Sequence, residues 1–508
     1  MSQNIIISVS EAGSPASRTF EFKIAAGRQI LVQQKLTPVE SSQVREMAGQ
    51  YISMFSESCN ASQDYLSILG DGLFHIFFEA GWRNISSKIL EGGTLIIASE
   101  IPEVLQLPWE YLRLEGLVVG FDERFCIIRM PKVADGLSAS RAEIAPGPLR
   151  VLFVACDPLD YEQEEQWMLQ AAEGQDMVLQ ICDEGTLEEL KETARAFRPH
   201  LIHLVVQGRV KEGQAFFSML DGKARQRLHL PLELADALKG CGTQCVIFGG
   251  CQREAPSSLY LLSQNLVRYL PMAVSWNGKT SLAPALYRSL AKGRSISDAL
   301  SAARLEMQTA CLNEGEICAI PVFFAASDQQ TIFDAQKRAD VAVAPWTMKK
   351  SLRPLPGLSE GHAHGFVDRR LDLQRLTFAL LEGTARTLII TGPRGVGKSA
   401  LATMLAKRLA SSGYSLLPVY SSQNNPVSAT RLLEAFVSLL AKSGQVEAAQ
   451  RLRDSSRSAA DRQKSMLEVL NHGKFLILLD GLDPDEKTGK IKDPNLAEFY
   501  LQAQRVLD

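Results

Sequence analysis

Short apolar runs and stretches of helical spacing alternate along the chain from Ile5 to Ala325. Helical spacing is clear, for example, at 48–55 and 66–78. The apolar runs are typical of strands and lie at 5–9, 20–24, 94–98, 149–155, 201–206, 244–248, 272–276 and 321–325. From 149 to 326 this alternation predicts an α/β fold with a mostly parallel sheet flanked by helices.

One predicted helix has both of its ends marked in the sequence. Thr186 and Glu189 have the spacing of a capping box, and apolar residues then recur at helical spacing as far as Phe197. Pro199 cannot continue the helix, because it lacks a backbone N–H. The sequence therefore predicts a helix over 186–197.

Changes in composition divide the chain into four parts. The segment Ala145-Pro146-Gly147-Pro148 marks a boundary, and residues 328–358 combine prolines and basic residues with weak periodicity, as linkers do. The predicted parts are an N-terminal α+β region at 1–145 that leads into an α/β domain at 146–327, a linker at 328–358, and a second α/β domain at 359–508.

A phosphate-binding motif opens the second domain. Residues 392–399 fit the pattern G-x-x-x-x-G-K-[ST], after the apolar run Leu388–Ile390, which predicts a buried parallel strand, and before a helical pattern that extends to Leu409. Glycines let backbone N–H groups converge on phosphates, and the helix N-terminus adds partial positive charge. The predicted nucleotide-binding residues are Gly392, Pro393, Arg394, Gly395, Val396, Gly397, Lys398 and Ser399.

A second acidic element supports this site. The run Phe475–Leu479 predicts a strand, and Asp480 follows it with a carboxylate. A carboxylate at this point of a P-loop domain holds Mg²⁺, together with the hydroxyl of the P-loop serine. The two elements predict a nucleoside triphosphate site in which Ser399 and Asp480 are the metal ligands.

Composition excludes several other classes of protein. The chain has 508 residues, 46% of them hydrophobic, which predicts two to four domains with well-filled cores. A net charge of −3 argues against a dedicated nucleic-acid binder. We expect no membrane partner, since no apolar run spans a bilayer and no signal peptide is recognisable. Nine cysteines without C-x-x-C pairs favour a reduced, cytoplasmic protein.

The first α/β domain resembles a known family. Leu107-Pro108-Trp109-Glu110-Tyr111-Leu112 is similar to the "PWE-L" segment that precedes CHAT domains, which are caspase-like, and 283–293 is similar to a helix of that family. The resemblance extends from about Leu66 to Ala326 and implies a caspase-like, mostly parallel sheet flanked by helices. It also implies a cysteine protease dyad of His, within H-x-x-x-H-G, and Cys.

The dyad of this chain is degenerate. Cys251 occupies the position of the family's nucleophile, whereas Gln207 stands where the resemblance implies the catalytic imidazole. A glutamine side chain cannot accept and return a proton near neutral pH. His203, four residues upstream, is predicted to be a hydrogen-bonded histidine inside the sheet. We therefore doubt proteolysis by the usual dyad.

The second domain resembles STAND-type signal-transduction NTPases, which are related to AAA+ and NACHT proteins. Gly365-Phe366-Val367-Asp368-Arg369 is similar to their "F-V-G-R" box, which implies that Phe366 and Val367 pack against adenine. Asp480-Gly481-Leu482-Asp483-Pro484 is similar to their D-G-hydrophobic-D-E signature, with Pro484 in place of Glu. Asp483 is the candidate for positioning the attacking water, and we expect slow hydrolysis at best. Compared with this family's usual module, we expect the domain to be incomplete at its C-terminus.

These resemblances imply an ATP-dependent signalling or defence protein of bacterial type. ATP with Mg²⁺ would order the NTPase module and favour self-association, and the caspase-like domain would act mainly by binding a protein partner. Three alternatives stay open: an active CHAT cysteine protease that uses another base, an AAA+ motor that acts on nucleic acid or protein, and a scaffold that never binds nucleotide. We expect no nucleic-acid partner.

Overall fold

The structure is a computed structural model of the chain. It describes residues 4–12, 18–54, 63–131, 143–155, 162–182, 184–221, 225–249, 257–276, 283–314, 321–339, 369–381, 383, 385–393, 395–411, 413–421, 426–482 and 491–507. The chain forms two compact units, and most of the first lies between Met1 and Val343 and most of the second between Ala344 and Asp508. Each unit is described by itself.

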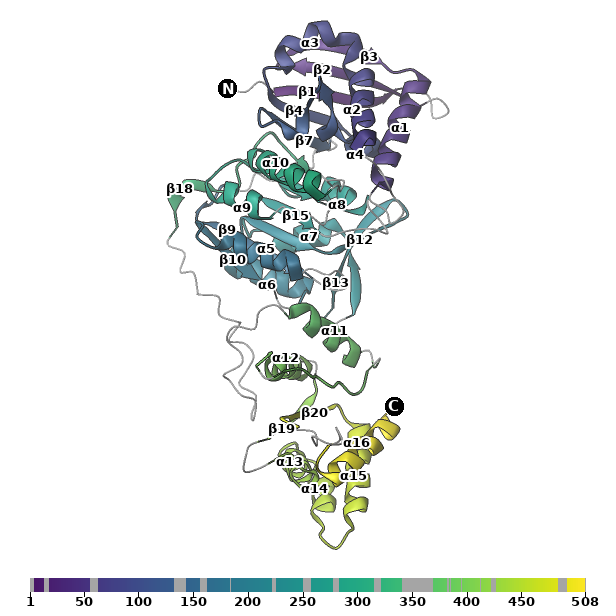
Figure 1. Ribbon diagram of the computed structural model, residues 1–508, viewed down its shortest axis with the longest axis vertical. Helices are drawn as coiled ribbons and strands as arrows, with labels where there is room; N and C mark the ends of the chain where they lie inside the picture. The colour runs from purple at the N-terminus through teal and green to yellow at the C-terminus, as the bar shows by residue number, and fades with distance from the viewer. Residues whose placement is uncertain are drawn as a thin grey trace. The chain divides into compact units, whose positions relative to one another are not determined.

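The first unit is built on an 11-stranded sheet (Figure 1). In order across the sheet the strands are β10 (Met177–Ile181), β9 (Leu149–Ala155), β11 (Leu201–Val205), β15 (Cys245–Gly249), β16 (Met272–Ser275), β17 (Val322–Ala325), β7 (Phe125–Pro131), β4 (Gly93–Ser99), β1 (Asn4–Ala12), β2 (Thr19–Ala26) and β3 (Gln29–Lys35). Only the pairs β16–β17, β1–β2 and β2–β3 are antiparallel. The predicted α/β fold with a mostly parallel sheet is confirmed.

Three small sheets accompany the large one in this unit. They are β12 (Gln207–Lys211) with β13 (Gln214–Leu220) and β14 (Gln226–His229), β8 (Pro146–Gly147) with β18 (Asp334–Arg338), and β5 (Arg113–Leu114) with β6 (Leu117–Val118). Strand β18 lies within the predicted linker, and residues 340–368 lie outside the described residues. The domain boundaries stay predictions.

Helices cover both faces of the large sheet (Figure 1). The α-helices of the first unit are α1 (Pro38–Ser53), α2 (Gln63–Phe77), α3 (Trp82–Ile89), α4 (Pro102–Gln106), α5 (Glu162–Ala172), α6 (Leu187–Phe197), α7 (Pro231–Leu238), α8 (Ser258–Leu266), α9 (Ala283–Ala291) and α10 (Ile296–Glu314). Short 3₁₀ helices lie at η1 (Glu79–Gly81), η2 (Trp109–Tyr111) and η3 (Val119–Phe121).

The central strands are buried along their whole length. Every residue of β4, β9, β11 and β15 is buried. Parallel strands covered by helices on both faces need apolar side chains in both directions, which explains why these strands read as continuous apolar runs. Strand β1 alternates instead, because only Ile5, Ile7 and Val9 face the core.

Helix α6 begins and ends as predicted. Thr186 is its N-cap, and its hydroxyl accepts a hydrogen bond of 3.1 Å from the backbone N–H of Glu189. The Glu189 carboxylate accepts from the backbone N–H of Glu184 at 2.8 Å. Arg198, with a φ of 52°, ends the helix in the left-handed conformation directly before Pro199.

The "PWE" segment contributes a fully buried ion cluster. The Glu110 carboxylate accepts bidentate bonds from Arg129 of β7 at 2.6 and 2.8 Å, and Arg304 of α10 lies 3.5 Å from it. Glu110 and Arg129 are 0% exposed and Arg304 is 2% exposed. Burial raises the pKa of Glu110, but the two guanidinium groups outweigh this effect and hold the pKa below its ordinary value. The cluster joins η2, β7 and α10.

His200 is a buried histidine directly before β11. It is 0% exposed, its Nδ1 accepts from the backbone N–H of Arg150 at 3.1 Å, and its ring stacks on Phe333. Burial, followed by the charge of Arg150, lowers the pKa of His200 from 6.5 to about 3. The folded unit therefore holds this imidazole neutral.

The low pKa of His200 predicts acid lability. Between the unfolded pKa of about 6.5 and the folded pKa, only the unfolded state binds the proton. The contribution of His200 to the free energy of unfolding is therefore complete above this window. Within the window the free energy of unfolding falls by about 1.4 kcal/mol for each pH unit of decrease. Asparagine at 200 offers an oxygen near the Nδ1 position but does not titrate. Urea unfolding at pH 7, 6 and 5 should therefore show a shallower loss for His200→Asn than for the wild type. The exposed His75→Asn is the control, and equal slopes for all three proteins would contradict the prediction.

The second unit contains a parallel pair, β19 (Ser415–Tyr420) with β20 (Phe475–Asp480). Its helices are α11 (Arg370–Leu381), α12 (Lys398–Ser411), α13 (Ala429–Lys442), α14 (Val446–Arg453), α15 (Ala459–His472) and α16 (Pro494–Leu507). One apolar cluster joins both strands to α13–α16. Another joins α11 to the predicted apolar face of α12, with Leu401, Met404, Leu405 and Leu409 buried.

The strand predicted at Leu388–Ile390 is wrong. These residues have no strand assignment, and Ile389 is 72% exposed. A strand requires a neighbour that completes its hydrogen-bond ladder. In the described part of this unit β20 pairs with β19 alone. Leu388 and Ile390 still pack against the α11–α12 cluster, which explains their apolar character.

Candidate functional site

The ends of β11 and β15 define one candidate site. These strands are parallel, and Val205 is in register with Gly249. Gln207 follows Val205 by two residues, and in the sequence Cys251 follows Gly249 by two. Parallel strands bring their carboxyl ends to one edge of a sheet, where sites form. Gln207 is half-buried at this edge, and Cys251 lies outside the described residues.

The glycine after Gln207 is held tightly against α8. A Cβ at Gly208 would lie 2.2 Å from the Ser258 hydroxyl oxygen, so no larger residue fits. The Gln207 side-chain oxygen accepts a bond of 3.2 Å from Arg209. The backbone at this position is therefore constrained, although the residue that the resemblance implies as the base is absent.

His203 is buried and engaged by other groups of the unit. It is 0% exposed, its Nδ1 is 2.8 Å from the Tyr287 hydroxyl of α9, and its Nε2 is 3.0 Å from Glu164 Oε1 of α5. A Cβ at Gly249 would lie 3.0 Å from the same Nε2. Both ring nitrogens thus face polar atoms of the protein, and the predicted hydrogen-bonded histidine inside the sheet is confirmed.

Glu164 and Tyr287 were not among the predicted site residues. Glu164 is 7% exposed, yet it lies in the acidic run Glu162-Gln163-Glu164-Glu165, which reads as a solvated helix face. No pattern in the sequence identifies its partner, because His203 is distant along the chain. Tyr287 lies in the segment that carries the CHAT resemblance, and this was the only signal available for it.

His229 also contacts other groups of the unit. His229 of β14 is buried, and its Nδ1 lies 2.8 Å from the Glu233 carboxylate. Its ring packs on Phe217 of the neighbouring strand β13. With Glu233 bound to one nitrogen and the ring covered by Phe217, His229 serves the packing of the small sheet.

Two cysteines close to Cys251 in the sequence are buried. Cys245, at the start of β15, is 0% exposed, and burial raises the pKa of its thiol far above the ordinary value. Burial also raises the pKa of Cys241, which is 3% exposed. Because the thiolate is the reactive species, we expect neither thiol to react readily at neutral pH.

The P-loop forms the second candidate site. Helix α12 begins at Lys398, and the backbone N–H of Leu401 donates to the Gly397 carbonyl in its first turn. Gly392, Gly395 and Gly397 have φ values of 148°, 86° and 89°, in the region that favours glycine. A Cβ at Gly395 or Gly397 would meet no atom within 4 Å, so the loop borders open space.

The P-loop lysine is held by its own loop. Lys398 Nζ donates to the carbonyls of Gly392 at 3.0 Å and Pro393 at 2.8 Å. Ser399 follows in the first turn of α12. The loop thus combines a lysine ammonium group on a long side chain, a serine hydroxyl and a helix N-terminus. A nucleoside triphosphate with Mg²⁺ requires this set of groups.

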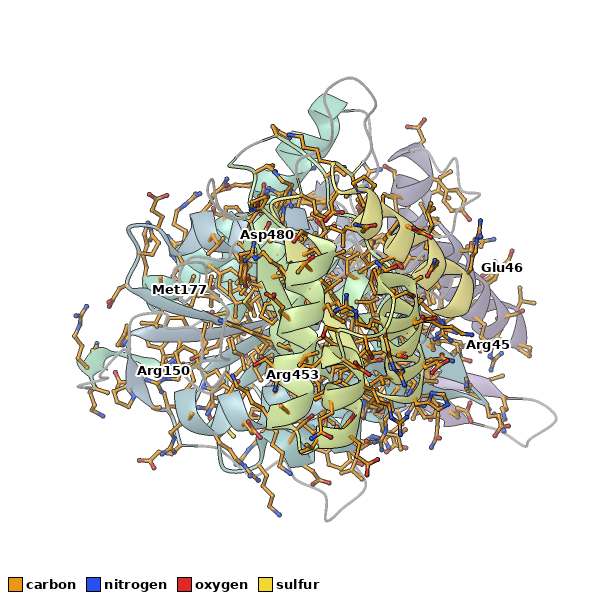
Figure 2. All side chains as sticks on the ribbon, turned by 90° about the horizontal axis from the view of Figure 1, so that it is seen from below. Arg45, Glu46, Arg150, Met177, Arg453 and Asp480 are labelled. Atoms are coloured by element: carbon orange, nitrogen blue, oxygen red, sulfur yellow. The ribbon has the colours of Figure 1, made fainter. Side chains whose placement is uncertain are left out.

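Asp480 ends β20, as the sequence predicts. Figure 2 labels this residue. Its carbonyl accepts a bond of 2.9 Å from the backbone N–H of Ser421. Helix α12 contacts β20, so the strand that carries Asp480 packs against the helix that carries Ser399. The remaining predicted site residues lie outside the described residues: Arg394 of the P-loop, Phe366 and Val367 of the adenine box, and Asp483.

The fold and its two sites define a caspase-like unit joined to a P-loop ATPase unit. The family model of the CHAT domain matches residues 80–333, and that of the AAA ATPase domain matches residues 365–499. The chain therefore belongs to the CHAT domain family and carries an AAA ATPase domain after the CHAT domain. No curated protein matches the chain. Among the described residues, no helix has the length and apolar character needed to cross a bilayer.

Proposed function

We propose that this protein is a cytoplasmic ATP-dependent switch of the STAND type whose CHAT domain binds a protein partner and does not cleave it. The observation that carries the proposal is Gln207, two residues after the end of β11, where Val205 is in register with Gly249 of the strand that precedes Cys251. Glutamine cannot act as a general base, and both nitrogens of His203 face other groups. The unit therefore retains the fold of a protease without its proton acceptor.

In this proposal, nucleotide binding to the second unit regulates the protein. Gly392–Ser399 would hold the phosphates of ATP, with Lys398 released from its two loop carbonyls. Ser399 and Asp480 would hold Mg²⁺, which supplies charge neutralisation of the phosphates when bound. A nucleotide shifts an equilibrium only by binding one state better than the other. Self-association through this unit, and a role in signalling or defence, are part of the proposal.

Thiol reactivity tests the degenerate dyad. In the wild type, Cys251 should react with iodoacetamide at neutral pH at the rate of an ordinary thiol with a pKa near 8.5. Gln207→His should raise this rate about tenfold, because an adjacent imidazole increases the thiolate fraction. Cys245 should stay unlabelled in both proteins, since burial keeps its thiol protonated. Peptide mass mapping after timed alkylation measures the rate for Cys251 in the wild type, the rate for Cys251 in Gln207→His, and the labelling of Cys245 in both proteins.

Two outcomes would contradict the proposal. A wild-type Cys251 that is already fast, together with cleavage of a partner that is lost in Cys251→Ala, would identify an active CHAT protease with another base. Rapid ATP turnover by a ring assembly would identify a motor-type AAA+ ATPase instead. Gln207→Asn, which keeps a carboxamide, is the matched control and should leave the alkylation rate unchanged.

A further inference from the structure

The hairpin that begins at Gln207 is rigid at its base and exposed at its tip. Strands β12 and β13 are joined by the two-residue turn Glu212-Gly213, whose φ values of 51° and 77° are those of a type I′ turn. Its base is fixed by the tight packing of Gly208 on α8. All residues from Arg209 to Gln214 are exposed (β12 and β13 in Figure 1).

The outer edge of β12 carries no other strand in the described part of the chain. In a hairpin with a two-residue turn, the residues that flank the turn form a hydrogen-bonded pair, which here is Lys211 with Gln214. The next hydrogen-bonded pair is Arg209 with Phe216. Because hydrogen-bonded residues alternate along an antiparallel pair, the backbone N–H and C=O of the intervening Val210 point away from β13. An extended peptide can add to such an edge by main-chain hydrogen bonds.

The side chains beside this edge are cationic. Gln207, Arg209 and Lys211 lie on one face of β12 at alternate positions, which are about 6–7 Å apart. Among the described residues, no carboxylate lies within ion-pair distance of Arg209 or Lys211. Phe216, half-buried opposite Arg209, adds an apolar surface on the same face. An extended segment presents its own alternate side chains at the same spacing.

We propose that the outer edge of β12 is the docking site for an extended acidic segment of a protein partner, with carboxylates at every second position facing Arg209 and Lys211. A nucleic acid fits this surface less well, because it cannot complete the ladder at Val210 and, among the described residues of β12, finds two cations. The inference rests on the proposed role of the CHAT domain as a binding unit. Edge cations can also serve to prevent strand pairing, and in that case no acidic peptide binds.

Fluorescence anisotropy with the full chain tests the site, with no nucleotide present. The probe is a fluorescein-labelled octapeptide of alternating glutamate and valine, at about 0.15 M salt. The wild type should bind it, and Arg209→Glu with Lys211→Glu should weaken binding at least about tenfold. Val210→Pro removes the outward N–H, is tolerated on an edge strand, and should weaken binding similarly. Lys292→Glu with Arg294→Glu, two exposed cations at the same spacing elsewhere in the unit, should have no effect.

The charge-reversed hairpin supplies a second readout that does not depend on loss of binding. The Arg209→Glu/Lys211→Glu protein should bind an octapeptide of alternating lysine and valine more tightly than the wild type does, which also shows that it is folded. Absence of peptide binding by the wild type would overturn the proposal, as would binding that both hairpin variants retain. Binding of a twelve-residue oligo(dT) that depends on Arg209 and Lys211, without peptide binding, would reassign the edge to nucleic acid. Because no nucleotide is used, these failures are distinct from failure of the ATP switch.

Discussion

Lys398→Ala should abolish the stabilisation of the second unit by ATP and Mg²⁺. At a ligand concentration one hundred times the Kd, binding to the folded state stabilises it by about 2.7 kcal/mol, and this effect should disappear in the variant. The reason is geometric: Lys398 begins α12 beside the glycine loop, and its ammonium group donates to the carbonyls of Gly392 and Pro393. Phosphate oxygens would take the place of these carbonyls. Thermal unfolding with and without nucleotide measures the effect.

The unliganded stability should change little in Lys398→Ala, because both lost bonds are exposed. The exposed Lys442→Ala, at the end of α13, is the matched control and should respond to ATP as the wild type does. A chelator that removes Mg²⁺ should reduce the ATP effect in the wild type, and Asp480→Asn should mimic this reduction. Unchanged nucleotide-dependent stabilisation in Lys398→Ala would refute nucleotide binding at the P-loop.

Glu110→Gln should be the most destabilising single substitution proposed for the first unit. It removes the only described carboxylate in contact with Arg129 and Arg304 and leaves two buried guanidinium groups without a counter-charge. Breaking a buried ion cluster in this way costs about 3–5 kcal/mol. Arg129 retains its bonds to the carbonyls of Leu105 and Leu107, so the loss arises from charge more than from unsatisfied donors. Urea unfolding at pH 7 measures the change in the free energy of unfolding.

Glu306→Gln is the matched control for Glu110→Gln. Its carboxylate pairs with Arg288 at 3.1 Å, but 57% of its side chain is exposed, so the loss should stay below about 0.5 kcal/mol. The sign of the pH dependence gives a further check. Because the folded pKa of Glu110 is lowered, its contribution is present above its unfolded pKa and is lost as the pH falls through the folded value. Equal losses in the two variants would contradict the role of the buried cluster.

Much of the large sheet was predictable because its strands are locally marked. The runs at 149–155, 201–206 and 244–248 are apolar in both directions, which only a strand buried on both faces requires. The P-loop was predictable for a similar reason, since its glycines and Lys398 are close in sequence. The apolar run Leu388–Ile390 misled the same argument, because apolar character reports burial against a neighbour and not pairing with one.

Contacts between residues that are far apart in the chain could not be predicted from the sequence. Glu110 was recognised as part of a motif, but its partners are Arg129 and Arg304, and nothing local connects them. Glu164 reads as a solvated acid, yet it lies 3.0 Å from His203 inside the unit. Such pairs depend on which helix covers which strand, and that is decided when the whole sheet assembles.

The sequence by itself determined two local features, the P-loop motif of an AAA ATPase domain and a CHAT domain with Gln207 at the position where the resemblance implies a histidine. Both depend on residue type at short spacing, and short spacing is preserved in any fold that keeps the local strand and helix. Only the tertiary structure decided that His203 is engaged by Tyr287 and Glu164 and that, in the described part of the chain, no other strand pairs with the outer edge of β12. These features arise from packing between elements distant in the chain, whose contacts no local pattern specifies.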